Sequence, residues 1–372
     1  MKKLRVAVLF GGRSGEHDVS LMSARSMLAA LDPEKYEVTQ VGITLDGEWL
    51  NGENTLESFS QRNIEDLDRV VLPGEPSHSA LYVLRSMNDH EMLEKLADID
   101  VFFPVLHGPF GEDGTLQGLL ELADVAYVGA GVAGSSVGMD KGIFKDVMRA
   151  HGIPIVDSIL VLRGDIENDI NAVIAQVEKM GAYPFFAKPA NLGSSVGISK
   201  CDSRSDLGEG LMEAARYDRR IIVERGVGQV REIEVSVLGN EDPQTSVCGE
   251  VMPSREFYSY ESKYIDGTSG LVIPAPLPQE TTKQIREYAV KAYKAIDCAG
   301  MARVDFFVEK DTNRVYLNEL NTIPGFTKIS MYPKLWEASG LPYANLVDRL
   351  IELALERKAD RDHTSHTFRS RA

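Results

Sequence analysis

Short apolar runs alternate with amphipathic helical patterns along the first third of the chain. An apolar run at residues 4–12 precedes a helical pattern at 19–31, and a second strand-like run covers 36–44. The apolar run at 99–108 is likewise followed by a helical pattern at 114–123. This alternation predicts an open parallel α/β sheet. Ligands of such sheets bind at the carboxyl ends of the strands, so the polar residues that follow these runs are candidates for a site.

The remaining patterns mix strands and helices and predict two further units. The elements expected there are helix 169–179, strands 183–190, 219–227 and 231–239, helix 280–296, a hairpin around residue 311 and helix 343–357. We therefore expect an N-terminal α/β domain at 1–133, a central α+β unit at 134–225 and a C-terminal α+β unit at 226–357. The polar, aperiodic tail at 358–372 is expected to be disordered.

The segment 315–325 has the pattern of a buried strand but carries polar residues. Because successive residues of a strand face opposite sides, Leu317, Glu319 and Asn321 are expected on one face. A second strand-like run at 300–310 comes just before it, and residues 311–313 form a plausible hairpin loop between the two.

With that loop, Asp305 lies opposite Glu319, and Arg303 lies opposite Asn321. Opposed residues project from the same face, and two opposed carboxylates repel each other without a cation. Mg²⁺ prefers carboxylate and amide oxygens together with substrate phosphates, so the hairpin predicts a magnesium site that carries a nucleotide. A solvated face on which Arg303 neutralises one acid is the alternative. Ca²⁺ fits less well, because no contiguous loop supplies about six oxygens.

The turn after Lys188 has the composition of an anion site. Gly193 and Gly197 permit turns that aim backbone N–H groups at an anion, Ser194 and Ser195 add hydroxyl donors, and Lys188 adds a charge. It is not a Walker loop, and no dinucleotide fingerprint follows the first strand. An ordinary flexible hairpin is the alternative interpretation of this turn.

Three other places suit a nucleotide enzyme. Glu224 follows apolar strand residues, where a carboxylate and the neighbouring backbone could receive an adenine amino group. Glu232 and Glu234 share a strand face, and one of them could accept ribose hydroxyls. The aromatic, charged and glycine-bearing segment 257–270 suits a mobile lid. Each also has a plain alternative as a solvated strand end or surface loop.

Composition excludes several classes of protein. The chain has 372 residues, is 43% hydrophobic and carries a formal charge of -16, which argues against a general nucleic-acid binder. Its three scattered cysteines suggest neither a disulfide framework nor a zinc site, so a reducing cytoplasm fits best. No segment approaches the ~18 apolar residues of a membrane helix, and the first apolar run is too short for a signal peptide.

The chain carries five motifs in order: GGRSGEHDVS from Gly11, LHGPFGEDGTLQG from Leu106, KPANLGSSVG from Lys188, YESKY from Tyr260 and NELNTIPGFT from Asn318. Together they resemble the D-alanine:D-alanine ligases of the ATP-grasp superfamily, and the similarity extends over about residues 3–355. The resemblance implies that the central and C-terminal units are the two ATP-grasp subdomains, with ATP between them.

The resemblance also implies roles for individual residues. ATP would be contacted by Lys141, Lys188, Ser195, Glu224, Arg225, Val227, Glu232 and Lys263. Two Mg²⁺ ions, or Mn²⁺ in their place, would be held by Asp305, Glu319 and Asn321. Glu16, Ser194 and Tyr264 would position the first D-alanine, with His107 nearby. Arg303 and the Gly325 amide would stabilise the oxyanion, and Ser330 and Met331 would receive the second D-alanine.

Several alternatives remain open at this point. His107 could be a core or turn histidine, the ribose contact could shift from Glu232 to Glu234, and Ser194 and Ser195 could exchange roles. A tyrosine at 264 favours a dipeptide over a D-lactate ester. A different ATP-grasp ligase or a non-catalytic nucleotide-binding module would share some of these features. The resemblance implies a cytoplasmic homodimer that makes D-alanyl-D-alanine for peptidoglycan.

Overall fold

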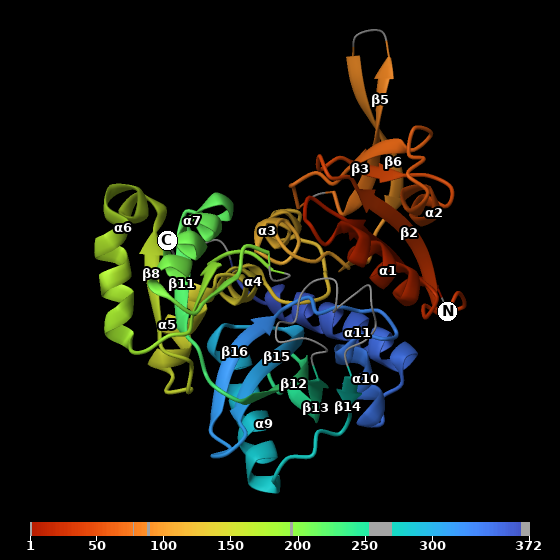
Figure 1. Ribbon diagram of the computed structural model, residues 1–372. Helices are drawn as coiled ribbons and strands as arrows, with labels where there is room; N and C mark the ends of the chain where they lie inside the picture. Colours follow the sequence, from red (N-terminus) through yellow and green to blue (C-terminus); the bar gives the residue numbers. More distant parts are fainter. Residues whose placement is uncertain (1, 77, 88–89, 194–195, 253–269, 366–372) are drawn as a thin grey trace, which may run out of the picture.

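The computed structural model describes residues 2–365 except for residues 77, 88–89, 194–195 and 253–269. Figure 1 shows three units: an N-terminal one in red and orange, a central one in yellow and green, and a C-terminal one in cyan and blue. Within the described residues, no helix is both long and apolar enough to cross a membrane.

The N-terminal unit contains a sheet in the order β6-β5-β4-β3-β2-β1-β7. Its strands are β1 (Leu4–Gly11), β2 (Tyr36–Ile43), β3 (Trp49–Asn51), β4 (Asp68–Val71), β5 (Ala80–Met87), β6 (His90–Asp98) and β7 (Val101–Pro104), and its helices are α1 (His17–Leu28), α2 (Thr55–Ser60), α3 (Thr115–Leu122) and α4 (Val132–Met139). The predicted α/β class is confirmed. Parallel pairing holds for β2-β1-β7, whereas β3 to β6 extend the sheet antiparallel.

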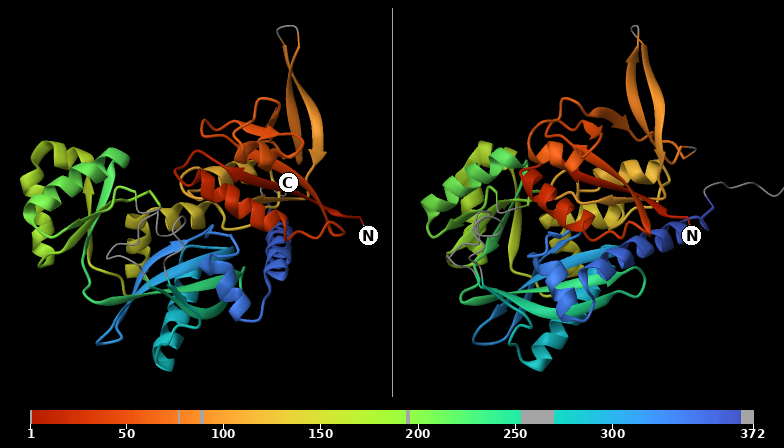
Figure 2. Two further views of the ribbon diagram at one scale, coloured as in Figure 1. Left: turned by 45° about the vertical axis from the view of Figure 1, so that its right-hand side comes forward. Right: turned by 90° about the vertical axis from the view of Figure 1, so that its right-hand side faces the viewer.

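The antiparallel extension escaped the sequence analysis for a physical reason. The hairpin β5-β6 projects from the body of the protein (Figures 1 and 2), and β6 is exposed along most of its length. A strand that is solvated on both sides has no alternation of apolar and polar residues to reveal it.

The central unit is an antiparallel sheet with two of its helices packed on one face. Its strands, in the order β10-β9-β11-β8, are β8 (Ser158–Leu162), β9 (Phe185–Pro189), β10 (Ser199–Cys201) and β11 (Arg220–Arg225). Its helices are α5 (Lys141–Ala150), α6 (Arg163–Val177), the 3-10 helix Glu178–Met180 and α7 (Arg204–Tyr217). Phe185 and Ala187 pack into the core beneath α6 and α7. The alternate residues Phe186 and Lys188 therefore face away from those helices.

The C-terminal unit is also an antiparallel sheet, in the order β14-β13-β12-β15-β16. Its elements are β12 (Val230–Gly239), β13 (Gln244–Met252), β14 (Gly270–Val272), α9 (Gln279–Ala295), β15 (Gly300–Glu309), β16 (Val315–Asn321), α10 (Met331–Ala338) and α11 (Tyr343–Arg361). Helix α9 covers one face, and Phe144 and Met148 of α5 join the same core. The other face is turned towards the central sheet, as Figure 1 shows.

The predicted pairing across β15 and β16 is confirmed, but the hairpin loop and the strand β16 differ from the predicted geometry. Asp305 pairs with Glu319, and Arg303 pairs with Asn321. The loop is one residue longer than predicted, because the Glu309 amide donates to the Arg314 carbonyl around residues 310–313. A bulge at Asn318 adds one residue on β16. The shift in register caused by the longer loop is offset by the bulge, so Asp305 still lies opposite Glu319.

The bulge corrects the predicted face of β16. Leu317 and Leu320 are buried in the core, whereas Asn318, Glu319 and Asn321 line a cavity on the opposite side. Leu317 therefore does not share a face with Glu319, because the extra residue reverses the alternation between them.

The predicted start of the disordered tail is also corrected. Helix α11 continues to Arg361, and the Arg361 guanidinium pairs with Glu121 and with Asp124 at 3.0 Å. Leu346 and Leu350 of α11 share a hydrophobic core with Val8 of β1, so this helix joins the first and last units. The other predicted domain boundaries stay predictions.

Candidate functional site

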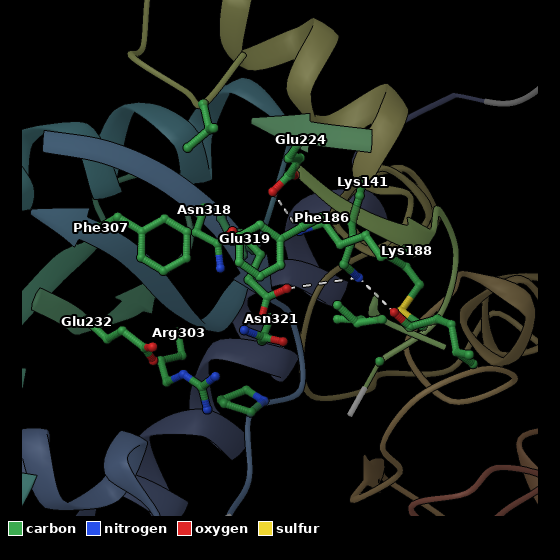
Figure 3. Close-up of a pocket in the computed structure, with 18 of the residues that line it drawn as sticks. Lys141, Phe186, Lys188, Glu224, Glu232, Arg303, Phe307, Asn318, Glu319 and Asn321 are labelled. Carbon is green, nitrogen blue, oxygen red and sulfur yellow. Dashed lines mark hydrogen bonds and ion pairs between the residues drawn. The ribbon is translucent and has the colours of Figure 1, made fainter. Parts of the chain in front are cut away.

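A cavity of about 350 Å³ lies where the three units meet. Its size falls within the range of small-molecule sites. The N-terminal unit contributes Glu16, His107 and Glu112, while the central sheet contributes Phe186, Lys188 and Glu224. The C-terminal unit contributes Glu232, Arg303, Phe307, Asn318, Glu319, Asn321 and the segment 322–325. Figure 3 shows how side chains of the central and C-terminal sheets converge on this space.

A buried carboxylate between two ammonium groups forms one end of the cavity. Glu224 Oε2 lies 2.9 Å from Lys188 Nζ, and Glu224 Oε1 lies 2.9 Å from Lys145 Nζ. Burial alone would raise the pKa of Glu224, but attraction by Lys145 and Lys188 outweighs it and lowers the pKa to about 2. Glu224 is therefore ionised at neutral pH and can accept hydrogen bonds.

Lys141 connects this end to the oxygen cluster. Its Nζ donates to the Leu192 carbonyl at 2.7 Å and lies 3.9 Å from Glu319 Oε2. Burial lowers the pKa of Lys141, and Glu319 opposes the shift. The lysine begins α5, where the Asp140 side chain caps the helix by accepting from the Gly142 and Ile143 amides.

The three predicted metal-binding side chains lie together on the hairpin. The Asn321 amide donates to Asp305 Oδ2 at 3.1 Å, and Glu319 is opposite Asp305 in the ladder. Arg303 forms a two-pronged pair with Asp305, at 2.8 and 2.7 Å, and its Nε lies 3.0 Å from Glu234. The alternative expected from the sequence was a solvated face on which Arg303 neutralises one acid. The pairing of Arg303 with an acid is present, but Asp305 is buried rather than solvated.

The chemistry of this donor set fits a hard divalent cation only in part. Among the described residues, no group of three or more His, Cys, Asp or Glu side chains is placed to hold a metal. Two carboxylates and one amide are nevertheless enough for Mg²⁺ when substrate phosphates supply further oxygens.

The two glutamates of β12 have different surroundings. Glu232 lines the cavity, whereas Glu234 is 7% exposed and pairs with Arg303. The geometry thus favours Glu232 over Glu234 as the residue that can reach a ligand. Arg225 and Val227 line the same end of the cavity as Glu224.

The N-terminal residues meet the cavity at its other end. A methyl group placed on Gly193 would lie 3.1 Å from Glu16 Oε2, so Glu16 lies directly against Gly193. His107 is buried: its Nδ1 lies 3.0 Å from the Ile323 carbonyl, and its Nε2 lies 3.0 Å from Ser23 Oγ. Burial lowers the pKa of His107, which keeps the imidazole neutral at pH 7.

Gly325 lines the cavity, and Ser330 supports it from behind. A Cβ atom at Gly325 would approach Ser330 Oγ to 3.1 Å, and that hydroxyl accepts from the Thr327 amide at 3.1 Å. Met331 packs in a core cluster with Val251 and Leu335. Ser330 and Met331 stand at the start of α10, and neither side chain is among those that line the cavity in the described structure.

Four predicted site residues lie outside the described residues: Ser194, Ser195, Lys263 and Tyr264.

The sequence is similar to known proteins over its whole length. The family model described as D-ala D-ala ligase N-terminus matches residues 5–130, and the one described as D-ala D-ala ligase C-terminus matches residues 147–352. The chain belongs to the D-alanine–D-alanine ligase family. A D-alanine–D-alanine ligase from Natranaerobius thermophilus is 49% identical over 99% of both chains, and one from Thermoanaerobacter sp. (strain X514) is 52% identical over 96% of this chain and 98% of that one.

Solved structures agree with this family assignment. The D-alanine-D-alanine ligase from Coxiella burnetii superimposes with a TM-score of 0.83 at 36% identity, covering 98% of this chain and 97% of that one. The VanG D-Ala:D-Ser ligase from Enterococcus faecalis has the same TM-score at 34% identity, covering 95% of this chain and all of that one. The resemblance inferred from the five motifs is confirmed, and the ATP-grasp fold of this ligase family with it.

Sequence reasoning missed several residues that the fold brings to this ligase site. Lys145 pairs with Glu224, Phe186 and Phe307 line the cavity from opposite sheets, and Asn318 enters it through the bulge. Only Lys145 had a usable signal, because it lies four residues after Lys141 on the same helix face. Glu112 lies within the motif LHGPFGEDGTLQG, whose pattern does not indicate a role for it.

Proposed function

We propose that this cavity joins two D-alanine molecules to D-alanyl-D-alanine with conversion of ATP to ADP and phosphate. The observation that carries the proposal is the composition of one cavity. The central unit brings lysines for phosphates to it, and the C-terminal unit brings a carboxylate-amide set for a metal and a guanidinium beside a backbone turn for an oxyanion. The N-terminal unit adds Glu16, His107 and Glu112. The product would serve peptidoglycan synthesis.

The nucleotide would bind at the Glu224 end. The ionised Glu224 carboxylate can accept from the adenine amino group, with Arg225 and Val227 beside it. Phe186 and Phe307 supply aromatic walls for the ring. Glu232 would accept ribose hydroxyls. Lys141 and Lys188 would neutralise phosphate charge, and we retain Ser195 and Lys263 in the same role.

Asp305, Glu319 and Asn321 would hold Mg²⁺, with Mn²⁺ as a substitute and two ions as the expected number. Bound there, the metal would neutralise the charge of the transferring phosphoryl group. Asp305 is paired with Arg303 in this structure, so it would share its oxygens between the guanidinium and the metal.

The chain's own residues then account for two steps. In the first, a carboxylate oxygen of D-alanine attacks the γ-phosphorus and ADP leaves, a transfer governed by positioning and charge neutralisation. In the second, the amine of the other D-alanine attacks the acyl phosphate carbonyl, an amide bond forms and phosphate leaves. The oxyanion formed on the way needs fixed donors, which Arg303 and the Gly325 amide would supply.

The two amino acids would bind at different places around Arg303 and Gly325. Glu16, with Ser194 and Tyr264, would hold the ammonium of the first D-alanine, near His107. The start of α10 at Ser330 and Met331 would receive the carboxylate of the second, because the first turn of a helix presents free N–H donors.

We further propose that the enzyme acts in the cytoplasm as a homodimer formed through its N-terminal unit. Met92, Leu93 and Leu96 are exposed apolar residues on the projecting strand β6, which supports an interface there. A Leu93→Glu substitution should convert a dimer to a monomer in sedimentation velocity, and an unchanged sedimentation coefficient would contradict that location.

The test of the reaction is phosphate release from ATP and Mg²⁺ with D-alanine, L-alanine, D-serine or D-lactate, with the product separated by chromatography. D-Serine is included because one structural neighbour is a D-Ala:D-Ser ligase. Release that requires D-alanine, yields the dipeptide and collapses in Asp305→Asn supports the proposal. Release that ignores D-alanine would leave only an ATP-binding fold. Preference for D-lactate at neutral pH would overturn the role given to Tyr264.

A further inference from the structure

The segment that carries Gly325 is held on both sides by residues of the N-terminal unit. Ile323 and Phe326 flank Pro324 and Gly325, and all four residues are buried. A proline has no N–H group, so the backbone of this short turn has one donor fewer with which to fix itself. Its position depends on partners elsewhere in the molecule.

Both backbone polar groups of Ile323 are hydrogen-bonded to side chains of the N-terminal unit. Its amide donates to Glu112 Oε2 at 3.3 Å, and its carbonyl lies 3.0 Å from His107 Nδ1. Glu112 Oε1 accepts from the Gly108 amide at 2.7 Å, which ties the carboxyl to the loop that carries His107. The side chains of His107 and Glu112 are 4% and 8% exposed, so water competes little with these bonds.

Phe326 is linked to the same histidine through two consecutive hydrogen bonds, with Ser23 between them; we call this chain of bonds the relay. Its amide donates to Ser23 Oγ at 3.3 Å, and Ser23 Oγ lies 3.0 Å from His107 Nε2. The Ile323 carbonyl can only accept, so Nδ1 carries the ring proton and the neutral imidazole accepts from the serine hydroxyl at Nε2. With this assignment, each hydrogen bond of the relay has one donor and one acceptor. Tyr343 donates to the Phe326 carbonyl at 2.6 Å and fixes the far side of the residue.

We propose that Ser23, His107 and Glu112 are positioning residues that hold the Ile323–Phe326 turn so that the Gly325 amide stays aimed at the reacting carbonyl. The inference rests on the proposed function, in which that amide stabilises the oxyanion. It gives His107 a role through the turn, distinct from the contact with the first D-alanine implied by the resemblance. An oxyanion donor must be fixed before the reaction, because reorienting it during the reaction would cost the stabilisation it supplies.

The fold offers a matched control for this role. Ser20 lies one turn before Ser23 on α1, and both side chains are fully buried. Ser20 Oγ accepts from the Gly11 amide at 2.8 Å and donates to the Val105 carbonyl, so it fastens α1 to the sheet without contacting the turn. Ser20→Ala and Ser23→Ala remove the same group from the same helix.

The experiment compares Ser23→Ala, Ser20→Ala and Glu112→Gln in the full-length protein. Displacing an oxyanion donor should cost less than deleting it, so Ser23→Ala should lower kcat about 10- to 50-fold, with the KM values for ATP and D-alanine within about threefold. Ser20→Ala should keep kcat within about threefold of the wild type. It should lower Tm by about as much as Ser23→Ala does. Glu112→Gln places an amide donor against a backbone donor and should resemble Ser23→Ala.

Hydrogen exchange of the peptide that covers Ile323–Phe326 provides a readout that does not depend on turnover. We expect faster exchange there in Ser23→Ala and Glu112→Gln and unchanged exchange in Ser20→Ala. Unchanged exchange in both test variants, or faster exchange with an unaltered kcat, overturns the inference. Equal losses of kcat in Ser20→Ala and Ser23→Ala would indicate a purely structural role and overturn it as well. Failure of the proposed function is seen separately, as wild-type phosphate release that does not need D-alanine.

Discussion

Two buried glutamates at opposite ends of the cavity differ in the direction of their pKa shifts. Glu224 and Glu112 are 4% and 8% exposed, so both carboxyls are largely removed from water. The pKa of Glu224 is lowered to about 2, because Lys145 and Lys188 outweigh the effect of burial. The pKa of Glu112 is raised to about 8 by burial and by the neighbouring charge of Glu16, against the amides of Gly108 and Ile323.

The difference shows that burial does not decide the charge of a group by itself. Two ammonium groups at 2.9 Å overcome the desolvation of Glu224, whereas two backbone amides do not overcome that of Glu112. The Glu224 end of the cavity, which we propose for the nucleotide, is thus organised by charge. The Glu112 end, which we propose for acyl transfer, is organised mainly by hydrogen bonds to a backbone turn.

The largest difference between the two ends should appear when each carboxyl is neutralised. Glu224→Gln leaves Lys145 and Lys188 buried without a counter-charge and should lower the free energy of unfolding by about 3–5 kcal/mol. Glu112→Gln at pH 7 should cost about 1 kcal/mol, because it alters one hydrogen bond of a mostly neutral group. Urea denaturation measures both, and equal losses would contradict the contrast.

The pH dependence of stability should separate the two glutamates next. A raised folded-state pKa means that the folded protein holds the proton more tightly, so the contribution of Glu112 is complete below about pH 4.5 and is lost as pH rises through about 8. A lowered folded-state pKa gives Glu224 the opposite sign, with a contribution present above about pH 4.5 and lost as pH falls towards 2.

The measurement is urea denaturation from pH 5 to 9. The wild type should lose stability relative to Glu112→Gln by up to about 1.4 kcal/mol per pH unit. The difference between the wild type and Glu224→Gln should stay constant over this range. A constant difference for Glu112→Gln would show that its carboxyl is ionised throughout.

A smaller effect should follow from removing one of the two ammonium groups at the Glu224 end. Lys145→Met leaves Glu224 paired with Lys188 and should lower the free energy of unfolding by about 1–2 kcal/mol. The KM for ATP should rise, because the carboxylate turns fully towards Lys188. Lys141→Met is the matched variant on the same helix. Since Lys141 lines the cavity, its loss should affect ATP binding more than stability, and the reverse pattern would contradict the assignment.

The smallest effect on stability should come from the bulge residue Asn318. Its Oδ1 is buried without a hydrogen-bond partner within the described structure, so Asn318→Ala should change the free energy of unfolding by less than about 0.5 kcal/mol. If the amide meets the nucleotide or its metal, the KM for ATP should rise about three- to tenfold. An unchanged KM would mean that Asn318 serves only to set the bulge.

The hairpin shows what local patterns can and cannot predict. Opposed pairing of Asp305 with Glu319 followed from two strand patterns and a short loop, and the structure confirms it. The loop and the bulge each differ by one residue from the expected geometry. A bulge leaves the composition of a strand unchanged, so only the ladder partners of Leu317 and Glu319 reveal it.

The turn at Gly325 shows more clearly what local sequence patterns cannot predict. The motif NELNTIPGFT marks Gly325 in the sequence, whereas no pattern marks Ser23, because a serine in an amphipathic helix has no distinctive signal. The contact between His107 and Ile323 joins residues 216 positions apart in the chain. No periodicity within a window of a few residues can report such a contact.

The sequence by itself determined strands β1, β2, β7, β9, β11, β12, β15 and β16, helices α1, α3, α6, α9 and α11, the order of the five motifs and the membership of the ligase family. These follow from local alternation and from residue identity along the chain. Only the tertiary structure decided that Glu224 is held between Lys145 and Lys188, that Asp305 is paired with Arg303, and that the Gly325 turn depends on the N-terminal unit. The physical reason is that charge state and backbone position depend on partners that packing brings together from distant parts of the chain.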